Sequence, residues 1–183
     1  MKKTIAIQVL LGLLCAASFA GCGSSSAQGG ETLSLLLQGD SAVGTEGSFI
    51  WITTLSTVDG EAFFFASDPV SGSEPWISDG TPEGTRLLKD IMPGPADSSP
   101  TPLFEHTFVA FNGLVYFAAN DGVSGLELWR TDGTEAGTEL AVDLIPGPEG
   151  YLIILLRASA NRLYISTFDG GVLTEVWVLE APL

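Results

Sequence analysis

A stretch of 36 residues occurs twice in this 183-residue chain, 53 positions apart. Residues 60–95 align without a gap on residues 113–148, and 19 of the 36 positions are identical. A repeat with a period near 50 residues is typical of folds that stack copies of one supersecondary unit, because each copy needs a neighbour to cover its apolar face. The repeat therefore predicts an array of similar units.

Short runs of β-forming residues alternate along the chain with Gly, Pro, Asp and Asn, and helical periodicity is nearly absent. This pattern predicts an all-β chain of antiparallel four-stranded repeats, arranged as about three propeller-like blades. The predicted strands are 33–38, 49–56, 62–67, 74–78, 86–91, 104–111, 114–119, 127–131, 139–144, 152–158, 162–167 and 174–180.

We expect residues 32–183 to form one repeat domain. Its predicted parts are repeats 57–109 and 110–158, a partial repeat 159–183, and residues 32–56 that complete the array. Closed propellers use about 4–8 blades, and three are too few for such a ring. Three outcomes are open: two chains join as a six-bladed ring, the arc closes in a small form, or the chain is a truncated remnant of a larger propeller.

The second copy contains the run Glu127-Leu128-Trp129-Arg130-Thr131-Asp132-Gly133-Thr134, and the first copy has Pro75 in place of the Leu. This run resembles the signature of a bacterial family named after its Glu-Leu-Trp-x-x-Asp-Gly-Thr repeat. The resemblance implies a propeller-like array in an exported or surface protein, with no activity assigned to the repeat itself. The signature positions are Glu74, Trp76, Asp79, Gly80, Thr81, Glu127, Trp129, Asp132, Gly133, Thr134, Glu175 and Trp177.

The amino terminus has the pattern of an export signal. Lys2 and Lys3 precede an uncharged, largely apolar run from Thr4 to Ala20, which is short for a bilayer span. The following Gly21-Cys22 resembles the bacterial lipobox, which implies a signal peptide over 1–21, a lipid on Cys22 and a flexible tether over 22–31. Gly23 after the Cys then implies the bacterial outer membrane or cell surface. The alternative is cleavage after Ala20, which would leave a soluble periplasmic or secreted protein.

The charge balance restricts the partners. Without residues 1–21 the chain keeps five basic residues against 22 acidic ones, a net charge of 5 − 22 = −17. Such a field repels phosphates, so we expect no nucleic acid partner. Membrane contact is expected through the amino-terminal lipid only, and self-association could complete a ring. No cofactor is predicted, and the protein or glycan ligand is not identified by the sequence.

The repeated acidic residues have two interpretations. Asp121, Glu127 and nearby carbonyls could hold Ca²⁺, but their spacing differs from that of regular calcium loops, and we expect turn capping instead. No metal site is predicted. Glu74, Glu127 and Glu175 each stand two positions before a Trp and are predicted to bond to a loop backbone in every blade, as a structural device.

Catalytic parts are not apparent in the sequence. Neither a zinc site nor a Ser-His-Asp triad has its components, because His106 is the only His and Cys22 the only Cys after the signal. We therefore predict a lipid-anchored binding or scaffolding surface in the cell envelope, without enzymatic activity. The alternative is an envelope hydrolase with paired acids outside the signature. Its candidates are Asp97, Glu105 and Asp169; His106 is expected on a strand surface and Trp51 as an exposed aromatic residue.

Overall fold

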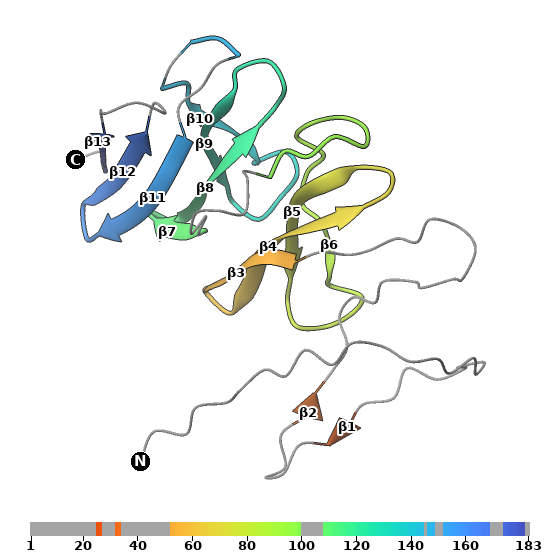
Figure 1. The fold of residues 1–183 in the computed structure, drawn as a ribbon. Coiled ribbons are helices and arrows are strands. Elements are labelled where there is room, and N and C mark those ends of the chain that lie inside the picture. Colours follow the sequence, from red (N-terminus) through yellow and green to blue (C-terminus); the bar gives the residue numbers. More distant parts are fainter. Residues whose placement is uncertain are drawn as a thin grey trace, which may run out of the picture. The chain divides into compact units, whose positions relative to one another are not determined.

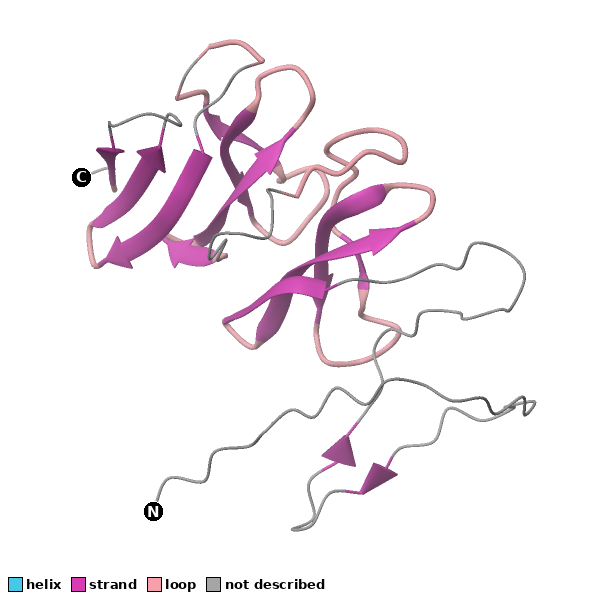
Figure 2. Ribbon diagram, in the orientation of Figure 1, coloured by secondary structure: helices cyan, strands magenta, loops and turns pink. Residues whose placement is uncertain are grey.

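The computed structural model describes residues 25–26, 32–33, 52–99, 108–144, 146–148, 152–168 and 174–181. The chain divides into two compact units, residues 1–33 and 34–183. In the first unit, β1 (Ser25–Ser26) pairs antiparallel with β2 (Thr32–Leu33). The described residues form strands, turns and loops without a helix (Figure 2), so none of them provides a long apolar helix for crossing a membrane.

The described residues of the second unit form three antiparallel sheets that follow one another along the chain (Figure 1). The first has the order β3-β4-β5-β6, the middle one β7-β8-β9-β10 and the third β11-β12-β13. These strands are β3 (Ile52–Val58), β4 (Glu61–Asp68), β5 (Gly72–Ser78), β6 (Arg86–Leu87), β7 (Val109–Phe111), β8 (Leu114–Asn120), β9 (Leu126–Thr131), β10 (Glu139–Val142), β11 (Leu152–Ser159), β12 (Arg162–Phe168) and β13 (Thr174–Glu180).

The all-β class and the antiparallel repeated sheets are confirmed, and no sheet closes on itself in the described part of the chain. The first two sheets are four-stranded meanders, as predicted. Their first hairpins turn at Asp59-Gly60 and Asn112-Gly113, where all four residues have positive φ. Two consecutive residues of positive φ are what a tight two-residue hairpin needs, and Asn, Asp and Gly adopt this conformation at low cost.

The fourth strands are shorter than predicted. β6 covers two residues of the predicted 86–91, and β10 covers four of the predicted 139–144. Beyond these strands the hydrogen-bond partners change: the N–H of Leu88 still bonds to Pro75 of β5 at 2.8 Å, whereas the N–H of Ile91 bonds to the Glu74 carboxylate and that of Leu144 to the Glu127 carboxylate. The predicted strand 33–38, apart from Leu33 in β2, and the starts of 49–56 and 104–111 lie outside the described residues.

One apolar cluster joins the first sheet to the middle sheet. Phe63 and Phe65 on β4 pack against Phe117 on β8, with Phe108 between the two strands. The ring centroids of Phe108 and Phe117 lie 5.0 Å apart, and those of Phe65 and Phe108 lie 5.3 Å apart. Such offset contacts stabilise an aromatic core beyond the burial of its area.

A second apolar cluster joins the middle sheet to the third sheet. Tyr116 and Leu128 face Leu156, Leu163 and Ile165 across this interface. Because successive side chains of a strand alternate between faces, β8 supplies Phe117 to one cluster and Tyr116 to the other. The middle sheet is therefore buried on both faces.

Candidate interaction surface

The signature glutamate of the first repeat fixes the loop that follows the fourth strand. Glu74 is fully buried, and its carboxylate accepts bonds from the N–H groups of Ile91 (2.9 Å) and Met92 (3.3 Å) and from the hydroxyl of Ser98 (2.6 Å). Burial raises the pKa of Glu74 to about 7, although these three donors act to lower it. The Glu74 carboxylate thus accepts N–H groups that would bond to backbone carbonyls if the strand continued.

The second signature glutamate has the same role and the third differs. Glu127 is buried and accepts a bond from the N–H of Leu144 at 2.6 Å. Glu175, in contrast, is exposed on β13 opposite Thr167. The predicted bond between this glutamate and a loop backbone therefore holds in two sheets, and in the third the side chain faces solvent.

The signature tryptophans also differ between the first two sheets and the third sheet. Trp76 lies between Phe64 and Leu87 in the strand register, and Trp129 lies between Phe117 and Leu140 at the matching positions. Trp129 belongs to the buried cluster, whereas Trp76 is half-buried. Within the described part of the chain, Trp177 pairs with Ile165 on one side only, and it is exposed. The first two tryptophans are packing residues in equivalent settings.

The acidic turns between the second and third strands are capped as predicted. The Asp68 carboxylate accepts bonds from the N–H groups of Val70 (2.7 Å) and Ser71 (2.9 Å), and Asp121 does the same for Val123 and Ser124. Partial burial opposes ionisation, but these bonds hold the pKa of Asp68 and of Asp121 below the usual value. Their lone pairs are engaged with the turn backbone.

The Asp-Gly-Thr loops, residues 79–85 and 132–138, are folded by their own side chains. In the second loop, the Asp132 carboxylate accepts from the N–H and hydroxyl of Thr134, and Thr134 in turn accepts from the N–H of Gly137. A Cβ on Gly137 would lie 2.0 Å from the Asp132 carboxylate, which explains the glycine. The bonds from Thr134 hold the pKa of Asp132 below the usual value.

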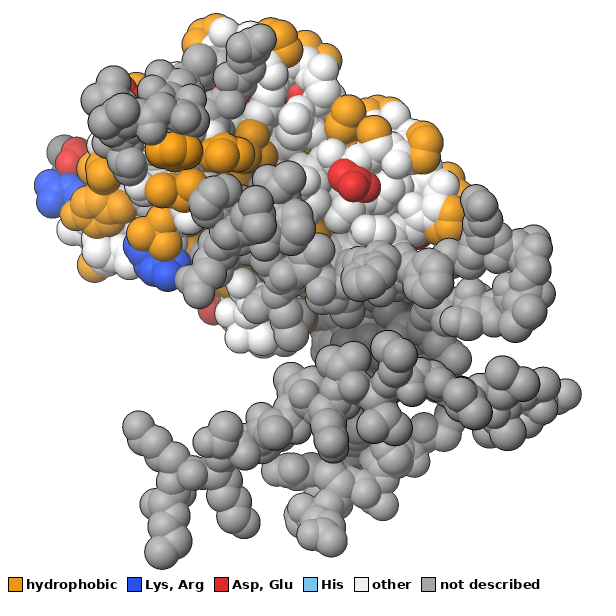
Figure 3. All heavy atoms as spheres, in the orientation of Figure 1, with side chains coloured by type: hydrophobic (Ala, Val, Ile, Leu, Met, Phe, Trp, Pro, Cys, Tyr) orange, Lys and Arg blue, Asp and Glu red, His pale blue; other side chains and the backbone are white. Residues whose placement is uncertain are grey.

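The outer face of the third sheet is the largest departure from the repeat. It presents the exposed apolar side chains Leu155, Tyr164, Val176 and Val178. Figure 3 shows hydrophobic and basic side chains side by side on the surface over this sheet. The only described carboxylate on the face is that of Glu180, and Arg162 pairs with it at 3.0 Å.

Register makes this face equivalent to buried faces in the other sheets. Tyr164 and Val176 match Tyr116 and Leu128 of the middle sheet, 48 positions earlier. Tyr116 is 4% exposed and Tyr164 is 38% exposed, while Leu128 is 0% and Val176 is 66% exposed. In the middle sheet the following sheet covers these positions. The same positions in the third sheet face solvent.

The remaining candidates are dispersed or undescribed. Asp97 accepts a bond from the N–H of Ser73 at 2.8 Å, which is a structural role at the start of β5. Four other candidates lie outside the described residues, and so does the lipid attachment residue; these are Glu105, Asp169, His106, Trp51 and Cys22. Among the described residues, no three His, Cys, Asp or Glu side chains gather as a metal site.

A shallow pocket of about 150 Å³ lies between the turns of the first two sheets, lined by residues 58–59 and 110–115.

Family models, curated proteins and solved structures contain no match to this chain. The open face of the third sheet was not predicted from the sequence. The sequence signal lies in β12, where Arg162 and Ser166 flank Tyr164 on one face of the strand, whereas the matching residues of β8 are Leu114 and Ala118.

Proposed function

We propose that this chain is an exported, lipid-anchored β-repeat protein of the cell envelope that serves as a binding and scaffolding surface. The docking surface is the outer face of the β11–β13 sheet, and its occupant is a second copy of this chain. The observation that carries the proposal is the 38% exposure of Tyr164 and the 66% exposure of Val176, at positions that are buried in the middle sheet.

The charged side chains on the outer face of the third sheet favour self-association through this face. Two chains without residues 1–21, each with a net charge of 5 − 22 = −17, repel one another over most of their surface. On the outer face of the third sheet, however, Arg157 is added to the Arg162–Glu180 pair, so the described residues of the face carry no excess of negative charge. Approach of a second acidic copy through this face therefore meets no excess of like charge among the described residues.

A head-to-tail ring has less support than a face-to-face pair. In a ring, the third sheet of one copy would cover the face of the first sheet that carries Phe64 and Ala66. Both side chains are already buried within one chain. Packing of two equal third-sheet faces around a two-fold axis needs only the exposed apolar face, and it gives a closed, self-complementary contact.

Sedimentation equilibrium of the chain from Gly30 onward tests this proposal. We expect a monomer–dimer equilibrium in the micromolar range, and Val176→Lys should shift it to monomer because the substitution places a charge in the contact. Val123→Lys is the matched control, since Val123 is also exposed but lies on a turn of the middle sheet. A monomer at all concentrations, or equal effects of the two substitutions, would contradict self-association through this face.

A further inference from the structure

The two Asp-Gly-Thr loops have the same internal geometry. The hydroxyl of Thr81 donates to Asp79 at 2.7 Å, as Thr134 does to Asp132, and the loop glycines at 80 and 133 have φ of 90° and 89°. The N–H of Gly84 bonds to Thr81 at 3.0 Å, against 2.9 Å in the second loop. Their backbone carbonyls therefore point in corresponding directions.

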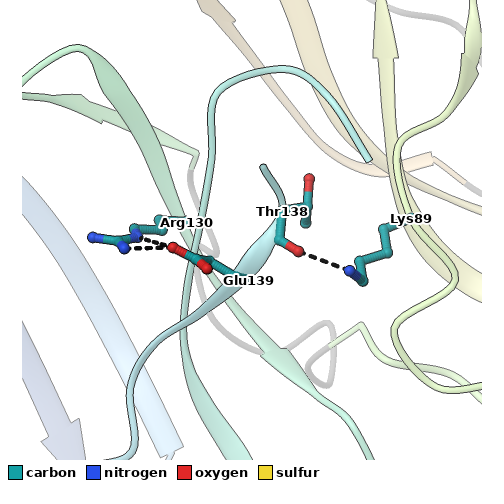
Figure 4. A network of polar contacts seen from close by, with 4 residues as sticks. All are labelled: Lys89, Arg130, Thr138 and Glu139. Atoms are coloured by element: carbon teal, nitrogen blue, oxygen red, sulfur yellow. Dashed lines mark hydrogen bonds and ion pairs between the residues drawn. The ribbon is translucent and has the colours of Figure 1, made fainter. Parts of the chain in front are cut away.

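The second loop binds two cationic side chains of the first repeat. Arg86 donates to the carbonyl of Gly133 at 2.7 Å. Lys89 donates to the carbonyl of Thr138 at 2.8 Å and approaches that of Glu135 at 3.5 Å. Figure 4 shows Lys89 reaching Thr138 beside the surface pair of Arg130 and Glu139. A guanidinium and an ammonium group thus occupy a set of three carbonyls.

The corresponding carbonyls of the first loop are those of Gly80, Pro82 and Thr85; the Pro82 carbonyl accepts the N–H of Thr85 at 3.3 Å, as the Glu135 carbonyl accepts that of Thr138 at 3.2 Å. Gly80 is exposed where Gly133 is half-buried, and Thr85 is half-buried where Thr138 is fully buried. Within the described part of the chain, no side chain donates to the carbonyl of Gly80 or Thr85. The exposed carboxylates of Asp79 and Glu83 add negative charge at the same loop.

We propose that loop 79–85 is a binding site for a basic polypeptide segment that presents an arginine and a lysine three residues apart, as Arg86 and Lys89 are presented to the second loop. Carbonyl acceptors and nearby carboxylates select guanidinium and ammonium donors. The net charge of −15 draws such a segment toward the protein at low ionic strength.

A capped peptide with the sequence of residues 84–90, Gly-Thr-Arg-Leu-Leu-Lys-Asp, is a suitable probe. We expect it to shift the amide NMR signals of residues 80–85 in the isotope-labelled full chain, held in a nonionic detergent. Residues 133–138 should not shift, because their carbonyls are occupied. A peptide with Gln in place of Arg and Lys should bind about tenfold more weakly or not at all.

Opening the second loop supplies a matched control. In the variant Arg86→Gln/Lys89→Gln, the carbonyls of loop 132–138 lose their cationic partners, so the same peptide should now also shift residues 133–138. If this variant loses its dispersed spectrum, Lys89→Gln alone serves, since it exposes the Thr138 carbonyl. Absence of shifts in the opened loop would overturn the proposal.

Three further results of the peptide titration would overturn the proposed site or its ligand. An unshifted loop 79–85, or equal binding of the neutral peptide, would overturn the site. Spermidine binding as tightly as the peptide would overturn a polypeptide ligand in favour of small cations. The inference is independent of self-association: Val176→Lys on the third sheet should leave the peptide shifts unchanged, and loss of those shifts in this variant would contradict two separate surfaces.

Discussion

The middle and third sheets have the same register and different surroundings. In the middle sheet, β8 is buried on both faces, because one sheet packs on Phe117 and another on Tyr116. In the third sheet, β12 buries Leu163 and Ile165 and exposes Tyr164. The two sheets therefore share the pairing of their second and third strands, β8 with β9 and β12 with β13, and differ in the number of sheets that pack on them. Repetition of a unit fixes its internal contacts, while its place in the array decides how much of it meets solvent.

The largest effect on stability should come from replacing Tyr116, whose equivalent in the third sheet is Tyr164. Tyr116→Ala removes a ring that is 4% exposed between two sheets, and we expect the free energy of unfolding to fall by about 3–5 kcal/mol. Tyr164→Ala, at the equivalent position of the third sheet, should lower it by less than about 1 kcal/mol at low protein concentration. Urea unfolding measures both. Similar losses would show that the two faces are covered alike.

A second contrast separates the buried Glu74 from the exposed Glu175. The folded pKa of Glu74 is raised from 4.5 to about 7, so the unfolded chain ionises first as the pH rises. Stability should therefore fall by about 3 kcal/mol between pH 4.5 and pH 7 and stay level above it.

Urea unfolding across this pH range checks the Glu74 prediction. Glu74→Gln should abolish most of the fall, because the side chain no longer titrates. Glu175→Gln should leave the pH dependence unchanged. A wild-type stability that rises from pH 4.5 to pH 7 would contradict the assigned direction.

Thr167 offers a smaller and opposite effect. Its buried hydroxyl has no hydrogen-bond partner among the residues that the structure describes, whereas the matching positions in the first and middle sheets are Ala66 and Ala119. Thr167→Val keeps the shape and removes the unpaired hydroxyl, so we expect a gain of about 1–2 kcal/mol. Thermal unfolding is the measurement, with Ser166→Val on the outer face as a control. A loss of stability would mean that the hydroxyl has a partner.

The two interfaces between sheets also differ in their polar contacts. Lys89 bonds to the second loop, and the matching position in the second repeat is Val142, so this contact belongs to the first interface. Lys89→Met should lower the free energy of unfolding by about 1 kcal/mol, because the contact is partly buried. Val142→Met is the matched control. No change from Lys89→Met would indicate that the bond does not join the sheets.

Much of the fold could be predicted because the repeat and the turn residues are local signals. The Asp-Gly and Asn-Gly hairpins, the capping role of Asp68 and the bonding of Glu74 to a loop all follow from residue types at fixed spacing. The shortened β6 and β10 could not be predicted, since a β-forming run does not reveal that a distant carboxylate takes its N–H groups.

The interaction surfaces were harder to predict than the strands. The exposure of Tyr164 was not predicted, because the repeat implies equal surroundings for each copy. The polar residues Arg162 and Ser166 on the same face of β12 mark a strand with one solvated face. The contacts of Arg86 and Lys89 with the second loop join residues more than 45 positions apart, and nothing in their local sequence predicts these contacts.

Nitration of tyrosine with readout by mass spectrometry tests the account most directly, because Tyr116 and Tyr164 hold equivalent positions in sheets with different neighbours. At low protein concentration Tyr164 should react readily and Tyr116 should be protected. At high concentration a second copy should protect Tyr164 as well. Equal reactivity of the two rings in the native protein, or reactivity of Tyr164 that does not depend on concentration, would contradict an open docking face on the third sheet.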